Sequence, residues 1–238
     1  MLLEVSLKVY TLLRFSRYHS AMVSTTTGLI VESLTRAIVE HRLHPGTKLS
    51  EQKLADQFGV SRTLVRQALF KLSQNQLVCM EPARGAFVAA PSIAEARQVF
   101  AVRRMLESGM TRDFIHSVTA ARIKSLKEHI AQERLAVQHG DVPHRTVLLG
   151  DFHVRMAQLM GNEVLAQLLQ DLISRCALIT LMYQSAGAAE HSHEEHAAIV
   201  QALEARDEAR ALLLMDEHLR NVEASLTLAP KASAKSKP

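Results

Sequence analysis

The stretch "SEQKLADQFGVSRTLVRQALFKL", Ser50 to Leu72, decides the fold of the N-terminal part of this chain. Ser50 and Ser61 are both good helix N-caps, and Gly59 can end the first of two short helices. Two short helices joined by a tight turn that contains glycine are typical of a helix-turn-helix. In the second helix the apolar residues recur at i, i+3, i+4 and i+7. This spacing predicts a buried stripe made of Val65, Ala68, Leu69 and Leu72.

The flanking segments extend this motif. An apolar stripe beginning at Ile30 predicts an earlier helix, which "HPG" at 44–46 ends. After Leu72, the β-prone runs "QLVCM" and "GAFVA" are joined by a turn with Pro82 and Gly85. Three helices and a β-hairpin make a winged helix-turn-helix, which we assign to residues 23–90.

The rest of the chain has only helical periodicity. Residues 92–95, "SIAE", have the spacing of a capping box, and amphipathic segments continue to about residue 229. We therefore predict an all-α bundle of six or seven helices over 91–229. The stripe of its first helix is predicted to be Val99, Val102, Leu106 and Met110. Residues 1–22 are interpreted as a disordered extension, and 230–238 as a disordered tail.

Composition narrows the class of protein. The chain has 238 residues, 47% of them hydrophobic, which is enough to form a core. It lacks an apolar run of about 18 residues, so no membrane span is expected. Two distant cysteines favour reduced thiols in a cytoplasm. Residues 24–90 carry eight Lys or Arg against five Asp or Glu, whereas 91–228 carry fourteen against eighteen. A polyanionic partner is therefore expected for the first part.

The cations of the second short helix point to DNA. Arg62 lies in the first turn, where it opposes the positive end of the helix dipole unless an anion binds there. In a helix-turn-helix this helix enters the major groove, and a phosphate supplies the anion. Ordinary solvated charges on a surface helix are the alternative. The predicted DNA contacts are Arg62, Thr63, Arg66, Gln67 and Lys71, with Arg84 and Gly85 at the hairpin tip.

The segment from Pro45 to Ala89 resembles the N-terminal domain of the GntR family of bacterial transcription regulators. The helical remainder resembles the FCD ligand-binding domain of that family's FadR branch. The pieces that carry this second resemblance are "VRRMLE" (102–107), "GDFHVRMAQLMGN" (150–162), "EEHAAIVQAL" (194–203) and "HL" (218–219). The resemblance implies a cytoplasmic, homodimeric, effector-responsive regulator. Such a protein is not an enzyme and is often a repressor that binds a palindromic operator.

Three histidines stand apart. His153, His196 and His218 each lie on the apolar stripe of a different predicted helix, so they can converge in the bundle. Neutral imidazoles suit Zn²⁺ or Ni²⁺. The resemblance implies metal binding by these histidines, with a fourth ligand, Asp or Asn, four residues before the first. Leu149 occupies that position, and a helix turns Asp151 to roughly the opposite side. The alternative is a polar pocket in which the histidines contact the effector directly.

Arg103 is the remaining candidate for effector binding. The resemblance implies that the arginine of "RxxLE" grips an effector carboxylate, for which its fork of donors is suited. An exposed or interfacial ion pair is the alternative. Taken together, these features favour a transcription factor controlled by a small organic acid. A metal-dependent hydrolase with a three-histidine site and a constitutive DNA-binding dimer are the alternatives.

Overall fold

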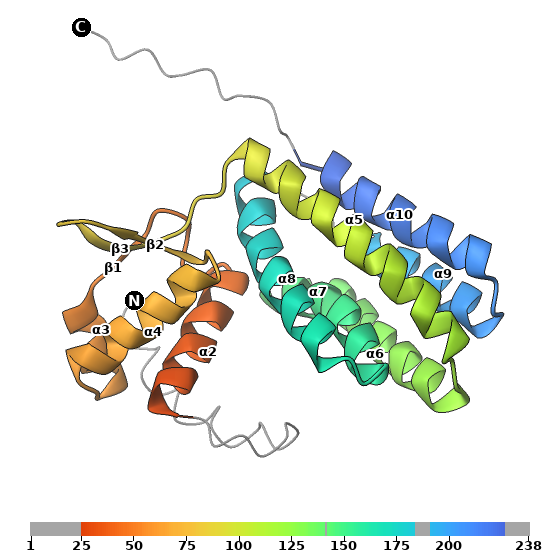
Figure 1. Ribbon diagram of the computed structural model, residues 1–238, viewed down its shortest axis with the longest axis horizontal. Coiled ribbons are helices and arrows are strands. Elements are labelled where there is room, and N and C mark those ends of the chain that lie inside the picture. The colour runs from red at the N-terminus through yellow and green to blue at the C-terminus, as the bar shows by residue number, and fades with distance from the viewer. Residues whose placement is uncertain (1–24, 141, 184–190, 227–238) are drawn as a thin grey trace, which may run out of the picture. The chain divides into compact units, whose positions relative to one another are not determined.

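The computed structural model describes residues 25–140, 142–183 and 191–226 (Figure 1). The extension predicted at 1–22 and the tail predicted at 230–238 lie outside the described residues. The described chain is mostly helical, with helices α2 to α10 and a small sheet, which confirms the predicted fold class. It divides into two compact units. One contains residues 25–35 and 48–87, and the other contains 36–47 and the described residues from 88 onward.

Three helices and three strands make up the N-terminal part. They are α2 (Thr26–Val39), β1 (Lys48–Leu49), α3 (Glu51–Phe58), α4 (Arg62–Gln74), β2 (Val78–Glu81) and β3 (Gly85–Val88). Ser50 and Ser61 cap α3 and α4 as predicted, because each hydroxyl accepts a hydrogen bond from a backbone N–H three residues later. Gly59 ends α3 with φ 64°, a left-handed conformation that favours glycine.

The sheet has one strand more than the predicted hairpin. Its strand order is β1-β3-β2, and β1 runs antiparallel to β3, with Lys48 opposite Phe87 and Leu49 opposite Ala86. A two-residue strand is too short to show the alternation that marks strands in a sequence, which is why it was not anticipated. Strand β1 thereby holds the segment before α3 against the β2–β3 hairpin, which is the wing.

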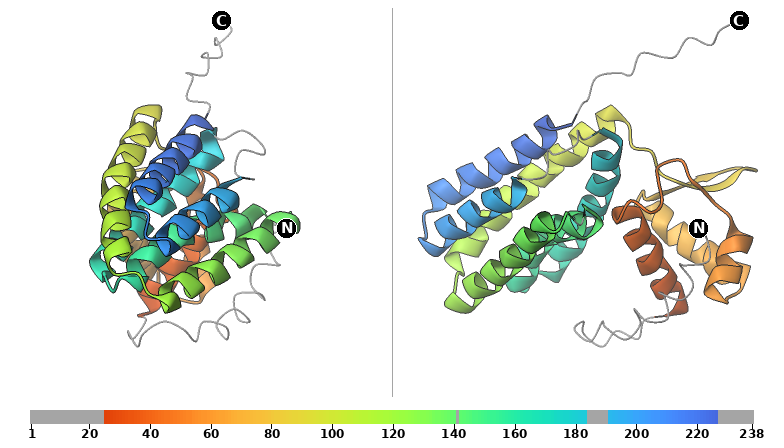
Figure 2. Two further views of the ribbon diagram at one scale, coloured as in Figure 1. Left: turned by 90° about the vertical axis from the view of Figure 1, so that its right-hand side faces the viewer. Right: turned by 180° about the vertical axis from the view of Figure 1, so that it is seen from behind.

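In the described part of the chain six helices form the bundle, within the predicted range. They are α5 (Ile93–His116), α6 (Ala120–Gln138), α7 (Val142–Leu159), α8 (Glu163–Tyr183), α9 (Ser192–Glu204) and α10 (Glu208–Ala224). Helix α10 packs along α5 and α9, while α7 packs between α6 and α8 (Figure 2). The side chains of Ser92, Thr119, Asn162 and Asp207 accept backbone hydrogen bonds at the starts of α5, α6, α8 and α10.

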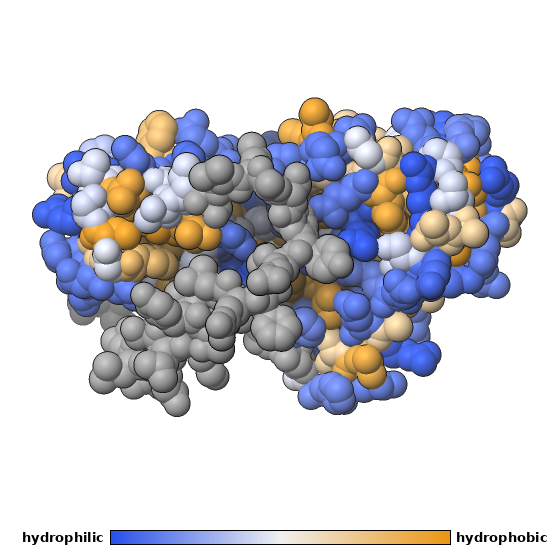
Figure 3. Space-filling model, turned by 90° about the horizontal axis from the view of Figure 1, so that it is seen from below, coloured by the Kyte–Doolittle hydropathy of each residue, from blue (hydrophilic) through white to orange (hydrophobic). Residues whose placement is uncertain are grey.

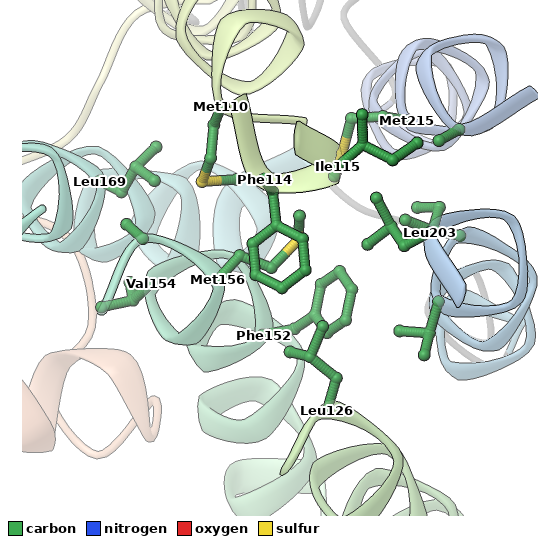
Figure 4. Packing of buried hydrophobic residues seen from close by; sticks show 14 of the residues in the cluster. Met110, Phe114, Ile115, Leu126, Phe152, Val154, Met156, Leu169, Leu203 and Met215 are labelled. Atoms are coloured by element: carbon green, nitrogen blue, oxygen red, sulfur yellow. The ribbon is translucent and has the colours of Figure 1, made fainter. Parts of the chain in front are cut away.

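Phe114 of α5 and Phe152 of α7 meet at the centre of the bundle core, surrounded by aliphatic and methionine side chains from all six helices (Figure 4). Helix α7 approaches α8 closely at Gly150, where an added Cβ would lie 2.5 Å from a methyl group of Ile173. The inner face of α5 differs from the predicted stripe. Val102 is 41% exposed, whereas the helix buries Arg103 and its neighbours along the same face.

The face shown in Figure 3 mixes hydrophilic residues with smaller hydrophobic areas. Helix α8 is long and apolar enough to cross a bilayer by length and composition. It nevertheless contains Asp171 and Arg175, and it packs against α5 and α7. We interpret it as a core helix of the bundle.

Candidate functional site

Helix α4 exposes the residues that were predicted to contact DNA. Its buried side is made of the four apolar residues of the predicted stripe. The solvent-exposed side carries Arg62, Thr63, Arg66, Gln67 and Lys71. Both the shape and the hydrogen-bonding groups of such a helix suit the major groove.

The N-terminus of α4 is suited to binding an anion. Its first turn contains no acidic residue, although acidic residues are the ones that stabilise this end of a helix. Arg62 is the first helical residue, and the hydroxyl of Ser61 accepts only from the backbone N–H of Leu64. An anion docked at this end would therefore meet unpaired backbone donors and a cation together.

Glu51, the first residue of α3, joins the two arginines of α4. Its carboxylate accepts two hydrogen bonds of 2.8 Å from Nε and Nη2 of Arg66, and Nη2 of Arg62 lies 3.3 Å from the same group. The hydrogen bond from Arg66 is the main cause that lowers the pKa of Glu51. Sequence analysis did not anticipate this contact, because it joins residues of two different helices that are eleven and fifteen positions apart in the sequence.

The hairpin tip presents the two remaining predicted contacts. Arg84 and Gly85 are exposed, and Gly85 has φ 97°, which favours glycine. The Arg84 guanidinium pairs with Glu81 and lies 5.2 Å from the centre of the Phe87 ring. The ring and the carboxylate together restrict where this cation can point.

The three predicted histidines converge in the bundle. His153 comes from α7, His196 from α9 and His218 from α10, and all are buried, with exposures of 2%, 0% and 3%. Each offers a ring nitrogen within 4.8 Å of the other two. His196 also stacks on Phe152 at a ring distance of 4.0 Å, so the site lies directly against the core.

Each histidine has a carboxylate at its Nδ1 atom. Both carboxylate oxygens of Glu133 lie 3.0 Å from Nδ1 of His196, and Glu195 Oε2 lies 2.7 Å from Nδ1 of His218. Glu107 Oε2 lies 2.6 Å from Nδ1 of His153, although without good hydrogen-bond angles. The three carboxylates come from α6, α9 and α5, respectively.

Ionised carboxylates accept but cannot donate, so these contacts place the imidazole protons on Nδ1 and leave Nε2 bare. Burial disfavours the charged form of Glu133, but its attraction to His196 and the hydrogen bond from His129 outweigh burial and lower the pKa of Glu133 to about 2. Burial in turn lowers the pKa of His153 to about 3 and that of His218 to about 4. Both are therefore neutral at neutral pH, the state that binds metals.

The Nε2 atoms fit a metal ion. Those of His196 and His218 lie 3.3 Å apart. Two bare nitrogens facing each other at this distance repel unless a cation lies between them. Zn–N bonds of about 2.0–2.1 Å at tetrahedral angles separate two ligand nitrogens by roughly 3.3–3.4 Å. The spacing of this pair therefore suits Zn²⁺ or a similar dication, and the ring nitrogen of His153 lies within 4.8 Å of both.

A fourth protein ligand is missing from this group. Among the described residues, the set of converging ligand atoms consists of the three histidines, with neither Leu149 nor Asp151. Burial raises the pKa of Asp151, and the largest effect that opposes this comes from His129. A water molecule or an effector oxygen would have to complete a tetrahedral site here.

Arg103 is buried in the bundle, so the predicted alternative of an exposed ion pair is wrong. Its Nε donates to Glu107 Oε1 at 2.7 Å, and its Nη1 lies 3.7 Å from Sγ of Cys176. Burial disfavours its charge, but Glu107 outweighs this effect and raises the pKa of Arg103. Its Nη2 is buried without a hydrogen-bond partner. Through Glu107, the arginine and His153 form one continuous polar chain.

A pocket of about 250 Å³ reaches this centre from the groove between α9 and α10. His218 and Glu195 line it, and Asn221 donates a 2.6 Å hydrogen bond to Glu195. Glu194 and Glu217 also line it. The pocket gives a small ligand a route to the edge of the histidine centre.

Sequence analysis missed the three carboxylates, although two of them carried a signal. Glu133 follows Leu126 and Ile130 at helical spacing, and Glu107 precedes Met110 by three residues. Each therefore occupies a position on an apolar stripe, where an unpaired charge is costly. The pairing itself joins different helices, and periodicity along one helix cannot reveal it.

Comparison with known proteins agrees with this arrangement. The family model "Bacterial regulatory proteins, gntR family" matches residues 26–88, and the FCD domain matches 98–221. The HTH-type transcriptional repressor RspR of Escherichia coli is 27% identical over 198 residues, covering 83% of this chain and 87% of that protein. The HTH-type transcriptional regulator LutR of Bacillus subtilis is 28% identical, covering 76% and 92%.

Two solved structures share the fold. McbR/YncC of E. coli has a TM-score of 0.76 at 20% identity and covers 85% of this chain and 97% of its own. A GntR regulator from Rhodococcus sp. RHA1 has a TM-score of 0.73 at 23% identity, covering 83% and 95%. The two family matches lie in the order expected for a DNA-binding unit followed by an effector-binding unit. The chain therefore belongs to the GntR family of bacterial transcriptional regulators and carries an FCD domain behind its winged helix-turn-helix.

Proposed function

We propose that the chain is a cytoplasmic repressor that binds a palindromic operator as a homodimer and releases it when a small carboxylate binds the FCD domain. The DNA-binding domain is assigned to residues 23–90, and the effector-binding and dimerisation domain to 91–229. The exposed cationic face of α4 carries the first part of this proposal. Dimerisation supports binding to a palindromic operator, because a two-fold symmetric dimer places two such helices in successive major grooves. The repressor role is drawn from the name of RspR.

On the DNA, the residues of α4 divide into two groups. Arg66 and Gln67 are assigned to base edges, since Arg reads guanine and Gln reads adenine. Arg62 and Thr63 near the helix start, and Lys71 further along, are assigned to phosphates or a thymine methyl. Arg84 and Gly85 are assigned to the backbone or the minor groove beside the wing.

In the FCD domain we assign a divalent cation, Zn²⁺ or Ni²⁺, to Nε2 of His153, His196 and His218. The observation that carries this assignment is the carboxylate at every Nδ1, because metal-binding histidines nearly always give their other N–H to such a partner. When bound, the metal supplies a Lewis-acidic position for an effector oxygen. Without a metal, the same histidines would contact the effector directly.

Arg103 is assigned to the effector through its unpartnered Nη2 atom. A buried donor without an acceptor costs free energy, and an effector carboxylate within reach would relieve that cost. Since Nε is already held by Glu107, the guanidinium is oriented before any effector arrives. The proposed anion therefore has two groups to recognise it, the metal and this arginine.

The test begins by selecting duplexes from a random DNA pool with the full-length protein. Small mono- and dicarboxylates are then screened, with and without Zn²⁺, for release of the selected duplex. The proposal expects enrichment of a palindrome and release by at least one acid. Enrichment without release by any acid would favour the constitutive dimer. No enrichment would refute the DNA-binding assignment.

A further inference from the structure

We propose that Glu51 is a positioning residue for DNA recognition, which holds the guanidinium of Arg66 in the orientation that reads a base. This inference rests on the proposed DNA-binding role of α4. It concerns an acidic residue on the cationic face, where a carboxylate would otherwise be expected to repel phosphates. The contact joins α3 to α4, the two helices of the helix-turn-helix (Figure 1).

The geometry of the contact is that of a two-point clamp. Glu51 Oε1 accepts from Nε of Arg66, and Oε2 accepts from Nη2, both at 2.8 Å. Two parallel hydrogen bonds fix the plane of a guanidinium, which a single ion pair does not do. The Glu51 side chain is 21% exposed, whereas that of Arg66 is 63% exposed. The carboxylate is thus sheltered while the arginine reaches outward.

The clamp leaves the outer edge of Arg66 available. A guanidinium has five N–H groups, and Glu51 occupies one on Nε and one on Nη2. Both N–H groups of Nη1 and the second N–H of Nη2 remain. These two nitrogens form the edge that can donate to O6 and N7 of guanine. The contact with Glu51 is therefore compatible with base reading by the remaining edge.

Holding the side chain in advance favours the specific complex. An unrestrained arginine loses rotamer freedom when it binds, and this loss weakens affinity for the correct base. A clamped arginine has lost that freedom already. The negative charge of Glu51 also discourages binding that uses Arg62 and Arg66 only as point charges. Both effects raise the ratio of specific to non-specific affinity.

The test compares the parent, Glu51→Gln and Asp56→Asn in the full-length protein. Asp56 lies on the same helix, is exposed, and contacts Gln52 rather than the arginines, so its variant removes the same charge without opening the clamp. The probes are the duplex selected by the parent and a scrambled duplex of equal composition. The measured quantity is the ratio of their dissociation constants at one salt concentration. Partial unfolding lowers both affinities equally and leaves this ratio unchanged.

We expect Glu51→Gln to lower the ratio by roughly three- to tenfold, while Asp56→Asn leaves it unchanged. In an Arg66→Ala background, Glu51→Gln should change the ratio no further. An unchanged or increased ratio in Glu51→Gln would overturn the inference. Glu51 would then only screen the charges of Arg62 and Arg66. An equal fall in both charge variants would overturn it as well. If the parent itself selects no duplex, the proposed function fails first.

Discussion

The buried pair formed by Arg103 and Glu107 gives a sharp prediction about stability. We expect Glu107→Gln, which removes the charge and nearly preserves the shape, to destabilise the FCD domain strongly. The two side chains are 4% and 0% exposed, so the arginine would keep a charge that water cannot reach. Removing one partner of such a pair costs about 3–5 kcal/mol.

The adjacent arginine provides a matched control. Arg104 pairs with Glu223, but these side chains are 24% and 23% exposed, so water reaches both groups and partly screens their charges. Glu223→Gln should therefore cost less than about 1 kcal/mol. For a domain of this size, about 1 kcal/mol corresponds to roughly 2–4 °C in Tm. The Tm values of the two variants should then differ by about 4 °C or more.

The assay is thermal and urea unfolding followed by far-ultraviolet circular dichroism, with metal removed from all samples. The double variant Arg103→Met/Glu107→Leu should regain most of the lost stability, because neither position then carries a buried charge. If Glu107→Gln unfolds at the same temperature as Glu223→Gln, the pair is not shielded from water and the reasoning is wrong.

Two further predictions concern packing and pH. Gly150→Ala should destabilise the protein by about 1–3 kcal/mol, because the new Cβ would meet Ile173. Gly109 has open space around it, so Gly109→Ala should be neutral or stabilising by up to about 1 kcal/mol. Urea unfolding measures both changes in stability. The metal-free protein should lose stability as pH falls from about 6.5 toward about 4. There the unfolded chain protonates histidines that the fold keeps neutral, with pKa about 3 for His153 and about 4 for His218. Each contributes up to about 1.4 kcal/mol per pH unit, and a urea midpoint that rises on acidification would contradict this.

Much of the fold could be predicted because its determinants are local. The caps at Ser50 and Ser61, the glycine between them and the apolar spacing of α4 each act within a few residues. The two-residue strand β1 lacked such a local signature. It exists because Lys48 and Leu49 lie beside β3 in the folded chain.

The histidine centre could be predicted in part for the same reason. Apolar spacing placed His153 on a buried helix face, but it also assigned Val102 to the core and Arg103 to its margin. The structure reverses that order, because Glu107 neutralises the arginine one turn away and makes its burial possible. The contact of Glu133 with His196 spans 63 residues, and only the packing of α6 against α9 creates it.

Metal content tests the assignment of the FCD centre most directly. Protein purified without a nickel column would be analysed by elemental mass spectrometry, together with His196→Ala and with His191→Ala, which alters an exposed histidine near the start of the same helix. The account predicts about one Zn or Ni per chain in the parent and in His191→Ala, and none in His196→Ala. A parent that stays free of metal after incubation with Zn²⁺, or a His196→Ala variant that keeps its metal, would contradict it.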